Sequence, residues 1–146
     1  MAPELQYIDQ LIRYRLEFFY PSGQPEEAPV IPDLNDWELP MAEFVYKNNL
    51  TIFEATALLV ALAPAIQPGL FDRAIESKLK DANNFPAIGG VRGKNSRAFL
   101  PTGETLLFLL AGDDLAARLS IQTIFGADHK FSVKKILWLE ELPQGE

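Results

Sequence analysis

Glycines and cations cluster in residues 88–97, where Gly93 directly precedes Lys94. A glycine-rich backbone beside a lysine can hold a phosphate group. A Walker A loop, however, needs a glycine five residues before the Gly-Lys pair and a hydroxyl residue directly after it, and Ile88 and Asn95 stand in these places. The segment is therefore predicted to be a glycine-bent wing, and no cofactor-binding residue is expected.

The same segment is a cationic island in an acidic chain. Arg92, Lys94 and Arg97 lie within six residues, and no acidic residue follows them until Glu104. Phe99 is the one aromatic residue among them, whereas a groove for single-stranded nucleic acid needs several stacking rings. We therefore predict that Arg92, Lys94, Arg97 and Phe99 bind an acidic protein surface rather than nucleic acid.

Two other groups of side chains are able to do chemistry. His129 is the only histidine, and the chain has neither a cysteine nor a Gly-x-Ser-x-Gly motif to place a nucleophile beside it. It is predicted to be a loop histidine that is hydrogen-bonded near a helix end. Asp113 and Asp114 have the oxygen ligands that Mg²⁺ prefers, but adjacent residues at a helix start point apart, so capping explains them better. No catalytic or metal-binding residue is predicted, and the segment is not expected to be an enzyme.

The composition is that of an acidic globular domain. The 146 residues include 13 Lys and Arg against 20 Asp and Glu, which gives a net charge of −7, and 48% are hydrophobic. The longest apolar run, residues 55–66, contains Pro64 and is shorter than the roughly 20 residues that a membrane-spanning helix needs. The N-terminus also lacks the basic lead-in of a secretory signal. We therefore expect a cytoplasmic protein without a membrane partner.

The first part of the chain should hold an amphipathic helix and a proline-rich connection. Apolar residues recur at helical spacing from Leu5 to Phe19, which predicts a helix over residues 3–20. Residues 21–32 contain four prolines, a composition typical of a linker or a strap. The helix is expected either to pack on its own domain or to dock on another subunit.

A capping box predicts the start of a central buried helix. The Thr51 hydroxyl and the Glu54 carboxylate are spaced to bind each other's backbone amides, and residues 52–63 are apolar almost all round. Pro64 and Pro68 should force a turn into a third helix. The exposed side of that helix is predicted to carry cations, at Arg73, Lys78 and Lys80.

The rest of the chain is predicted to alternate helices with short strands. Residues 85–101 favour a β-ribbon or wing, two helices follow over 103–111 and 115–125, and residues 133–139, which include Trp138, indicate a buried strand. The expected fold class is α+β and mostly helical. We expect a variant winged-helix-like domain with a small antiparallel β element, preceded by an N-terminal amphipathic helix. The predicted organisation is a helix at 1–20, a linker at 21–35, the winged-helix-like domain at 36–141 and the start of a further linker at 142–146.

Five stretches of the sequence carry a resemblance to a known family: Leu-Pro-Met at 39–41 with Phe44, Phe-Pro-Ala-Ile-Gly-Gly at 85–90, residues 97–105, residues 108–115, and Ile-Leu-Trp-Leu-Glu at 136–140. Together they resemble the N-terminal domain of bacterial AAA+ ATPases found alongside phage-tail-like contractile injection systems. The resemblance covers residues 36–141 and implies a variant winged-helix domain ahead of an ATPase module with its own Walker motifs.

The resemblance also implies a function. Such a domain is a non-catalytic adaptor that recognises a protein partner, or its own ATPase module, in the assembly or disassembly of the injection system. ATP and Mg²⁺ would bind in the ATPase module, whose motifs are absent from these residues, and the full-length protein would form a homo-oligomeric ring. The alternative is a winged-helix DNA-binding module that uses the third-helix and wing cations. The net charge of −7 argues against it, because phosphate contacts supply most non-specific affinity.

Overall fold

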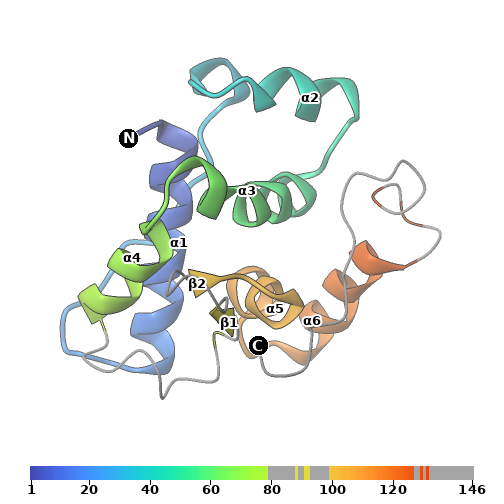
Figure 1. Cartoon of the computed structure of the whole chain (residues 1–146). Helices are drawn as coiled ribbons and strands as arrows, with labels where there is room; N and C mark the ends of the chain where they lie inside the picture. The colour runs from blue at the N-terminus through green and yellow to red at the C-terminus, as the bar shows by residue number, and fades with distance from the viewer. Residues whose placement is uncertain (79–87, 89–90, 93–98, 127–128, 130, 132–146) are drawn as a thin grey trace.

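The computed structural model describes residues 1–78, 88, 91–92, 99–126, 129 and 131. Most of these residues are helical (Figure 1). The elements, in chain order, are α1 (Pro3–Phe19), the 3-10 helix η1 (Leu34–Asp36), α2 (Met41–Lys47), α3 (Ile52–Ile66), α4 (Leu70–Lys78), β1 (Val91–Arg92), β2 (Phe99–Leu100), α5 (Gly103–Ala111), α6 (Leu115–Gln122) and the 3-10 helix η4 (Thr123–Phe125).

α1 lies in the hydrophobic core. It packs against α4, α3 and α5, and α4 lies along it in Figure 1. Its buried face consists of Glu4, Leu5, Ile8, Leu11, Ile12 and Leu16. The sequence leaves open whether this helix packs on its own domain or docks on another subunit, and in the structure it packs on its own domain.

The prediction of an α+β winged-helix fold is wrong. Among the described residues, the only paired strands are β1 and β2, two residues each, with Val91 opposite Leu100 and Arg92 opposite Phe99 in an antiparallel ladder. This ladder is not the sheet of a winged-helix domain. The core is instead built by helices packing on helices, and α1 contributes an apolar face to it through its contacts with α3, α4 and α5. The predicted strand at 133–139 lies outside the described residues.

α3 is the buried helix that its capping box predicts. The Thr51 hydroxyl accepts a hydrogen bond from the Glu54 amide at 3.1 Å, and the Glu54 carboxylate accepts one from the Thr51 amide at 2.9 Å. The helix continues through Pro64 to Ile66, three residues beyond its predicted end. By length and composition, no single helix in the described part of the chain would cross a membrane; α3 and α4 would suffice only as a pair, and a bend of 103° separates them.

Replacing Thr51 by Ala should lower the free energy of unfolding by about 1 kcal/mol, because the Glu54 amide loses its capping acceptor. Chemical denaturation of both proteins measures the difference. Thr123→Ser is a matched control, since it keeps a hydroxyl that is able to bind the Ser120 carbonyl. Equal midpoints for the parent and Thr51→Ala would contradict the prediction.

The proline-rich segment, residues 21–32, lies back along α1, and we call it the strap. The amide of Ser22 donates to the Glu17 carboxylate at 2.8 Å, and the Gln10 amide group donates to the backbone oxygen of Glu27 at 2.8 Å. Positions further along the strap therefore meet positions nearer the start of α1. The segment runs antiparallel to the helix.

The chain keeps this direction beyond the strap. The Trp37 indole donates to the backbone oxygen of Pro32 at 2.9 Å, and the Trp37 ring is buried. The carboxylate of Glu4, in the first turn of α1, then accepts from the amides of Glu38 at 3.2 Å and Leu39 at 2.9 Å. Glu4 is fully buried, so this acid holds the start of α1 to the segment ahead of α2.

α1 also stabilises the end of α5. The Arg15 guanidinium donates to the backbone oxygens of Leu109 at 2.9 Å and Leu110 at 3.3 Å, two carbonyls that lack partners within the helix. α5 then ends at Gly112, whose φ of +63° is in the region that favours glycine. A side chain at this position would also meet the Arg15 guanidinium at 2.9 Å.

Candidate functional site

The structure describes part of the predicted cationic surface. Arg92 lies in β1 and Phe99 in β2, and the two residues are partners across the ladder. Lys94 and Arg97 lie outside the described residues. The ladder therefore brings the backbones of Arg92 and Phe99 together, and the assignment of all four residues to a partner surface stays a prediction.

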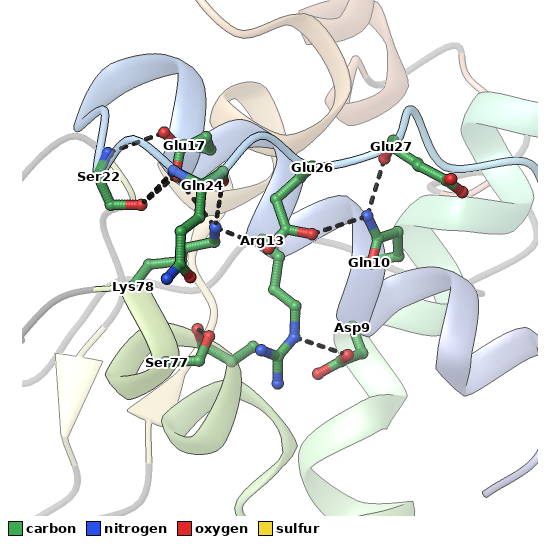
Figure 2. A network of polar contacts seen from close by, with 11 residues as sticks. Asp9, Gln10, Arg13, Glu17, Ser22, Gln24, Glu26, Glu27, Ser77 and Lys78 are labelled. Atoms are coloured by element: carbon green, nitrogen blue, oxygen red, sulfur yellow. Dashed lines mark hydrogen bonds and ion pairs between the residues drawn. The ribbon is translucent and has the colours of Figure 1, made fainter.

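Lys78, the last residue of α4, is at the centre of a polar cluster (Figure 2). Its Nζ lies 2.7 Å from Oε1 of Glu26 and 3.0 Å from Oε1 of Glu17, and it donates to the backbone oxygen of Gln24 at 3.1 Å. Only 4% of the Lys78 side chain is exposed. We call Glu17, Ser22, Gln24, Glu26 and Lys78 the strap clamp. The prediction that Lys78 is an exposed cation is wrong. The strap folds over the end of α4, and the Glu26 carboxylate of the strap pairs with the Lys78 ammonium.

The strap clamp joins three segments that are distant in the sequence. Glu17 belongs to α1, Glu26 to the strap and Lys78 to α4, so the cluster fixes the strap to both helices at once (Figure 2). Gln10 adds a hydrogen bond to Glu26 at 3.2 Å. Glu17 and Lys78 are 61 positions apart, and nothing in the local pattern of the sequence indicates their pairing. Sequence reasoning therefore missed this cluster.

Electrostatics keep the ionisable groups of the strap clamp charged. Hydrogen bonds from Ser22 and Lys78 lower the pKa of Glu17 from 4.5 to about 2. The hydrogen bond from Lys78 lowers the pKa of Glu26, against partial burial that acts to raise it. Burial acts to lower the pKa of Lys78, but the hydrogen bonds to Glu26 and Glu17 outweigh it, so the pKa is raised. Groups held charged in this way suit a structural role rather than proton transfer near neutral pH.

Acid should weaken the strap clamp. The pKa of Glu17 is lower in the folded than in the unfolded chain, so its carboxylate stabilises the fold above pH 4.5, and this contribution is lost as the pH falls from 4.5 toward 2. The difference in unfolding free energy between the parent and Glu17→Gln should therefore be largest near neutral pH and narrow through that window. Urea titrations at a series of pH values measure it.

Glu43→Gln is the matched control for this experiment. Glu43 forms an ion pair with Lys47 at 2.7 Å, but both side chains are about 70% exposed, so the substitution should change the stability at neutral pH by less than about 0.5 kcal/mol. A difference between the parent and Glu17→Gln that stays constant over the whole acid window would show that the Glu17 carboxylate is not clamped.

The single histidine lies beside the start of α3. Its Nε2 is 2.5 Å from Oε2 of Glu54, and its Nδ1 accepts a hydrogen bond from the Phe131 amide at 3.0 Å. Because Nδ1 accepts the backbone proton, Nε2 is the ring nitrogen that donates to the Glu54 carboxylate. The prediction of a loop histidine that is hydrogen-bonded near a helix end is confirmed.

The His129–Glu54 pair serves the fold. The Glu54 carboxylate binds the Thr51 amide through Oε1 and His129 through Oε2, and only 7% of its side chain is exposed. The His129 ring also stacks edge-on against Phe131, with ring centroids 5.0 Å apart. Both ring nitrogens have protein partners, so the pair positions residues 129 and 131 on the N-terminus of α3.

Of the two adjacent aspartates, Asp114 has the role that capping predicts for a helix start. Oδ1 of Asp114 accepts from the Ala117 amide at 3.1 Å and caps α6, while Asp113 is exposed. Within the described ranges, no group of three or more His, Cys, Asp or Glu side chains is placed to hold a metal ion. The buried carboxylates of Glu4 and Glu54 are bound instead to backbone amides and, for Glu54, to His129.

Comparison of the chain with protein-family models, with curated proteins and with solved structures finds no match. The resemblance of residues 36–141 to the AAA+ N-terminal domain therefore stays a prediction.

Proposed function

We propose that this chain is a non-catalytic, helical adaptor domain that binds a protein partner on behalf of an AAA+ ATPase module of a contractile injection system. The observation that carries the proposal is the set of five sequence stretches between residues 39 and 140 that resemble such domains. The ATPase chemistry, with its ATP and Mg²⁺, belongs to a module outside these residues.

The use of side chains in the structure supports recognition rather than chemistry. Buried or nearly buried charged groups, among them Glu4, Glu54 and Lys78, are bound to partners that hold the fold together. Large apolar side chains are exposed instead, and Tyr46 at 75% and Leu115 at 70% are among the most open. Adjacent exposed apolar side chains, as at Leu115 and Leu119 of α6, are typical of surfaces that bind other proteins.

The DNA-binding alternative is not favoured. It needs the cations of α4 on the surface, but Lys78 is buried between two carboxylates, and α4 also carries Asp72 and Glu76. Of the cations proposed for that helix, Arg73 is exposed, and Lys80 lies outside the described residues. A helix with this charge balance offers little attraction for phosphate groups.

A capture experiment tests the proposal. The tagged chain is mixed with extract from cells that assemble a contractile injection system, and the bound proteins are identified by mass spectrometry. We expect an AAA+ ATPase or a component of the injection apparatus. A variant with Arg92, Lys94 and Arg97 replaced by Ser should capture less of it at an unchanged melting temperature, because the proposal assigns these cations to the partner and not to the fold.

Two control assays can contradict the proposal. Tight binding of generic duplex DNA at physiological salt, lost in the triple Ser variant, would support the DNA-binding alternative instead. ATP hydrolysis by the purified chain, abolished in Lys94→Ala, would show that the domain is itself catalytic. Failure to capture either an ATPase or an injection component would also count against the adaptor role.

A further inference from the structure

We propose that one open face of α6 docks an amphipathic helix of a protein partner, and that this helix carries basic residues beside its apolar stripe. The inference rests on the proposed adaptor function and names the chemistry of the partner. α6 lies at the edge of the helical body, next to α5 (Figure 1). One side of it packs on the core through Ile121, and the other side is open.

The open side presents two leucines in line. Leu115 and Leu119 are one helical turn apart, so they lie on the same face, and they are 70% and 59% exposed. The other exposed positions on this side are small or uncharged. We call the set the α6 face, and it consists of Leu115, Ala116, Leu119, Ser120, Gln122 and Thr123.

The composition of the α6 face differs from that of an ordinary solvent-exposed helix surface. Charged residues make up 23% of the chain, yet none belongs to this face. Leaving two leucines in water forgoes the roughly 1.5 to 3 kcal/mol that burying each of them would give. Small residues at Ala116 and Ser120 form the row beside the two leucines, where a second helix is able to approach closely, in the manner of ridges packing into grooves. The face therefore fits the apolar stripe of another helix.

The charges around the α6 face indicate which kind of partner helix it favours. Asp113 and Asp114 are exposed at the start of α6, and the Glu104 side chain is 47% exposed on the neighbouring α5. The only cation from residue 103 to residue 126 is Arg118, which pairs with Glu104 and donates to the Gly112 carbonyl oxygen at 2.7 Å. Arg15 of α1, which also lies near Gly112, is bound to the Leu109 and Leu110 carbonyl oxygens. Among the described residues of α5 and α6 the carboxylates therefore outnumber the cations, and a partner with Lys or Arg beside its apolar stripe complements them.

A second copy of the chain is the less favourable occupant. It would bring the same exposed carboxylates to the interface, and each copy has a net charge of −7. Like charges of this size oppose close approach at low and moderate salt. The excess of carboxylates therefore favours a partner of opposite charge.

Peptide titration followed by NMR tests this inference on the whole chain. The probe is a synthetic peptide of about 18 residues, long enough to form a helix, with leucines on one face and lysines on its flanks. One control peptide has glutamates in place of the lysines, and another has the same composition in scrambled order. We expect the lysine peptide alone to shift the amide signals of residues 115–123.

Matched variants tie the binding to the α6 face. Leu115→Gln with Leu119→Gln should weaken binding of the lysine peptide by at least about tenfold, because both apolar contacts are lost. Val30→Gln with Ile52→Gln, at two positions that are 83% and 59% exposed on other segments, should leave binding unchanged. Thermal melts of both double variants check that the fold is intact.

Three outcomes would overturn the inference: equal affinity for the glutamate peptide, unchanged binding by the leucine double variant, or a parent dimer in sedimentation experiments that this variant abolishes. The last outcome would assign the face to a second copy. Capture of an AAA+ ATPase by both the parent and the leucine variant would leave the adaptor function in place and refute only the role of α6. Binding of the lysine peptide to the α6 face without capture of an AAA+ ATPase or an injection component would support the role of α6 and count against the adaptor function.

Discussion

Removal of residues 1–20 should abolish cooperative folding of the chain. α1 places five apolar side chains in the core, and burying a side chain of this kind contributes about 2 kcal/mol. Their combined contribution is about 10 kcal/mol, which is comparable to the whole stability of a typical domain. The same deletion leaves the end of α5 without Arg15 and the strap clamp without Glu17. We expect the shortened chain to have little helical circular dichroism and no cooperative melt.

Two single substitutions in α1 give a graded version of this experiment. Leu16 is fully buried, so Leu16→Ala should cost about 3 kcal/mol, whereas Phe18 is 62% exposed and Phe18→Ala should change the stability by less than about 0.5 kcal/mol. Urea titrations measure both. If residues 21–146 alone gave a cooperative transition with the helical signal of the remaining helices, α1 would be an attached arm and not part of the core.

The elements that the sequence predicts well are those with local determinants. The capping box of Thr51 and Glu54 acts over three residues and correctly marks the start of α3. Asp114 caps α6 for the same reason, because its acceptor is a backbone amide only three positions away. Apolar spacing likewise predicts α1 and α4, since the residues that face the core recur with the helical period.

The placement of these elements depends on contacts between residues far apart in the chain. The proline-rich composition of residues 21–32 indicates an extended segment, but it does not show that Lys78 holds this segment on α1. Because of this proline-rich composition, the sequence predicts a linker at residues 21–35 between the N-terminal helix and a winged-helix-like domain. The winged-helix prediction is wrong because the described residues are mostly helical and form no winged-helix sheet. The packing of α1 against α3, α4 and α5 is a further contact between distant residues that the composition does not show.

The same limit applies to the candidate site. Lys78 has the periodicity of an exposed cation on an amphipathic helix, and only the return of the strap buries its ammonium. His129 offers the opposite case. The absence of a cysteine or a nucleophile motif in the sequence already indicates a structural histidine, and Glu54 and the Phe131 amide bind its two ring nitrogens.

Replacing Glu4 by Ala should lower the free energy of unfolding by about 3 kcal/mol. Glu4 is fully buried, and its carboxylate accepts hydrogen bonds from the amides of Glu38 and Leu39. Removing it leaves both amides without this acceptor, and each loss costs about 1 to 3 kcal/mol where water does not enter. The first turn of α1 also loses a negative charge that favours the positive end of the helix dipole.

Glu4→Gln separates the hydrogen bonds from the packing. Glutamine has the same shape and keeps one oxygen acceptor, but its NH₂ group cannot accept from the second backbone amide. We therefore expect the free energy of unfolding of Glu4→Gln to lie between that of the parent and that of Glu4→Ala. Hydrogen exchange in residues 38 and 39 should rise in the same order, because these two amides lose their acceptor. A cost below about 0.5 kcal/mol for Glu4→Ala, the level of an ordinary surface substitution, would contradict the prediction. That result would mean that the segment ahead of α2 is held on α1 mainly by Trp37 and Met41, the neighbouring apolar residues that are buried in the core.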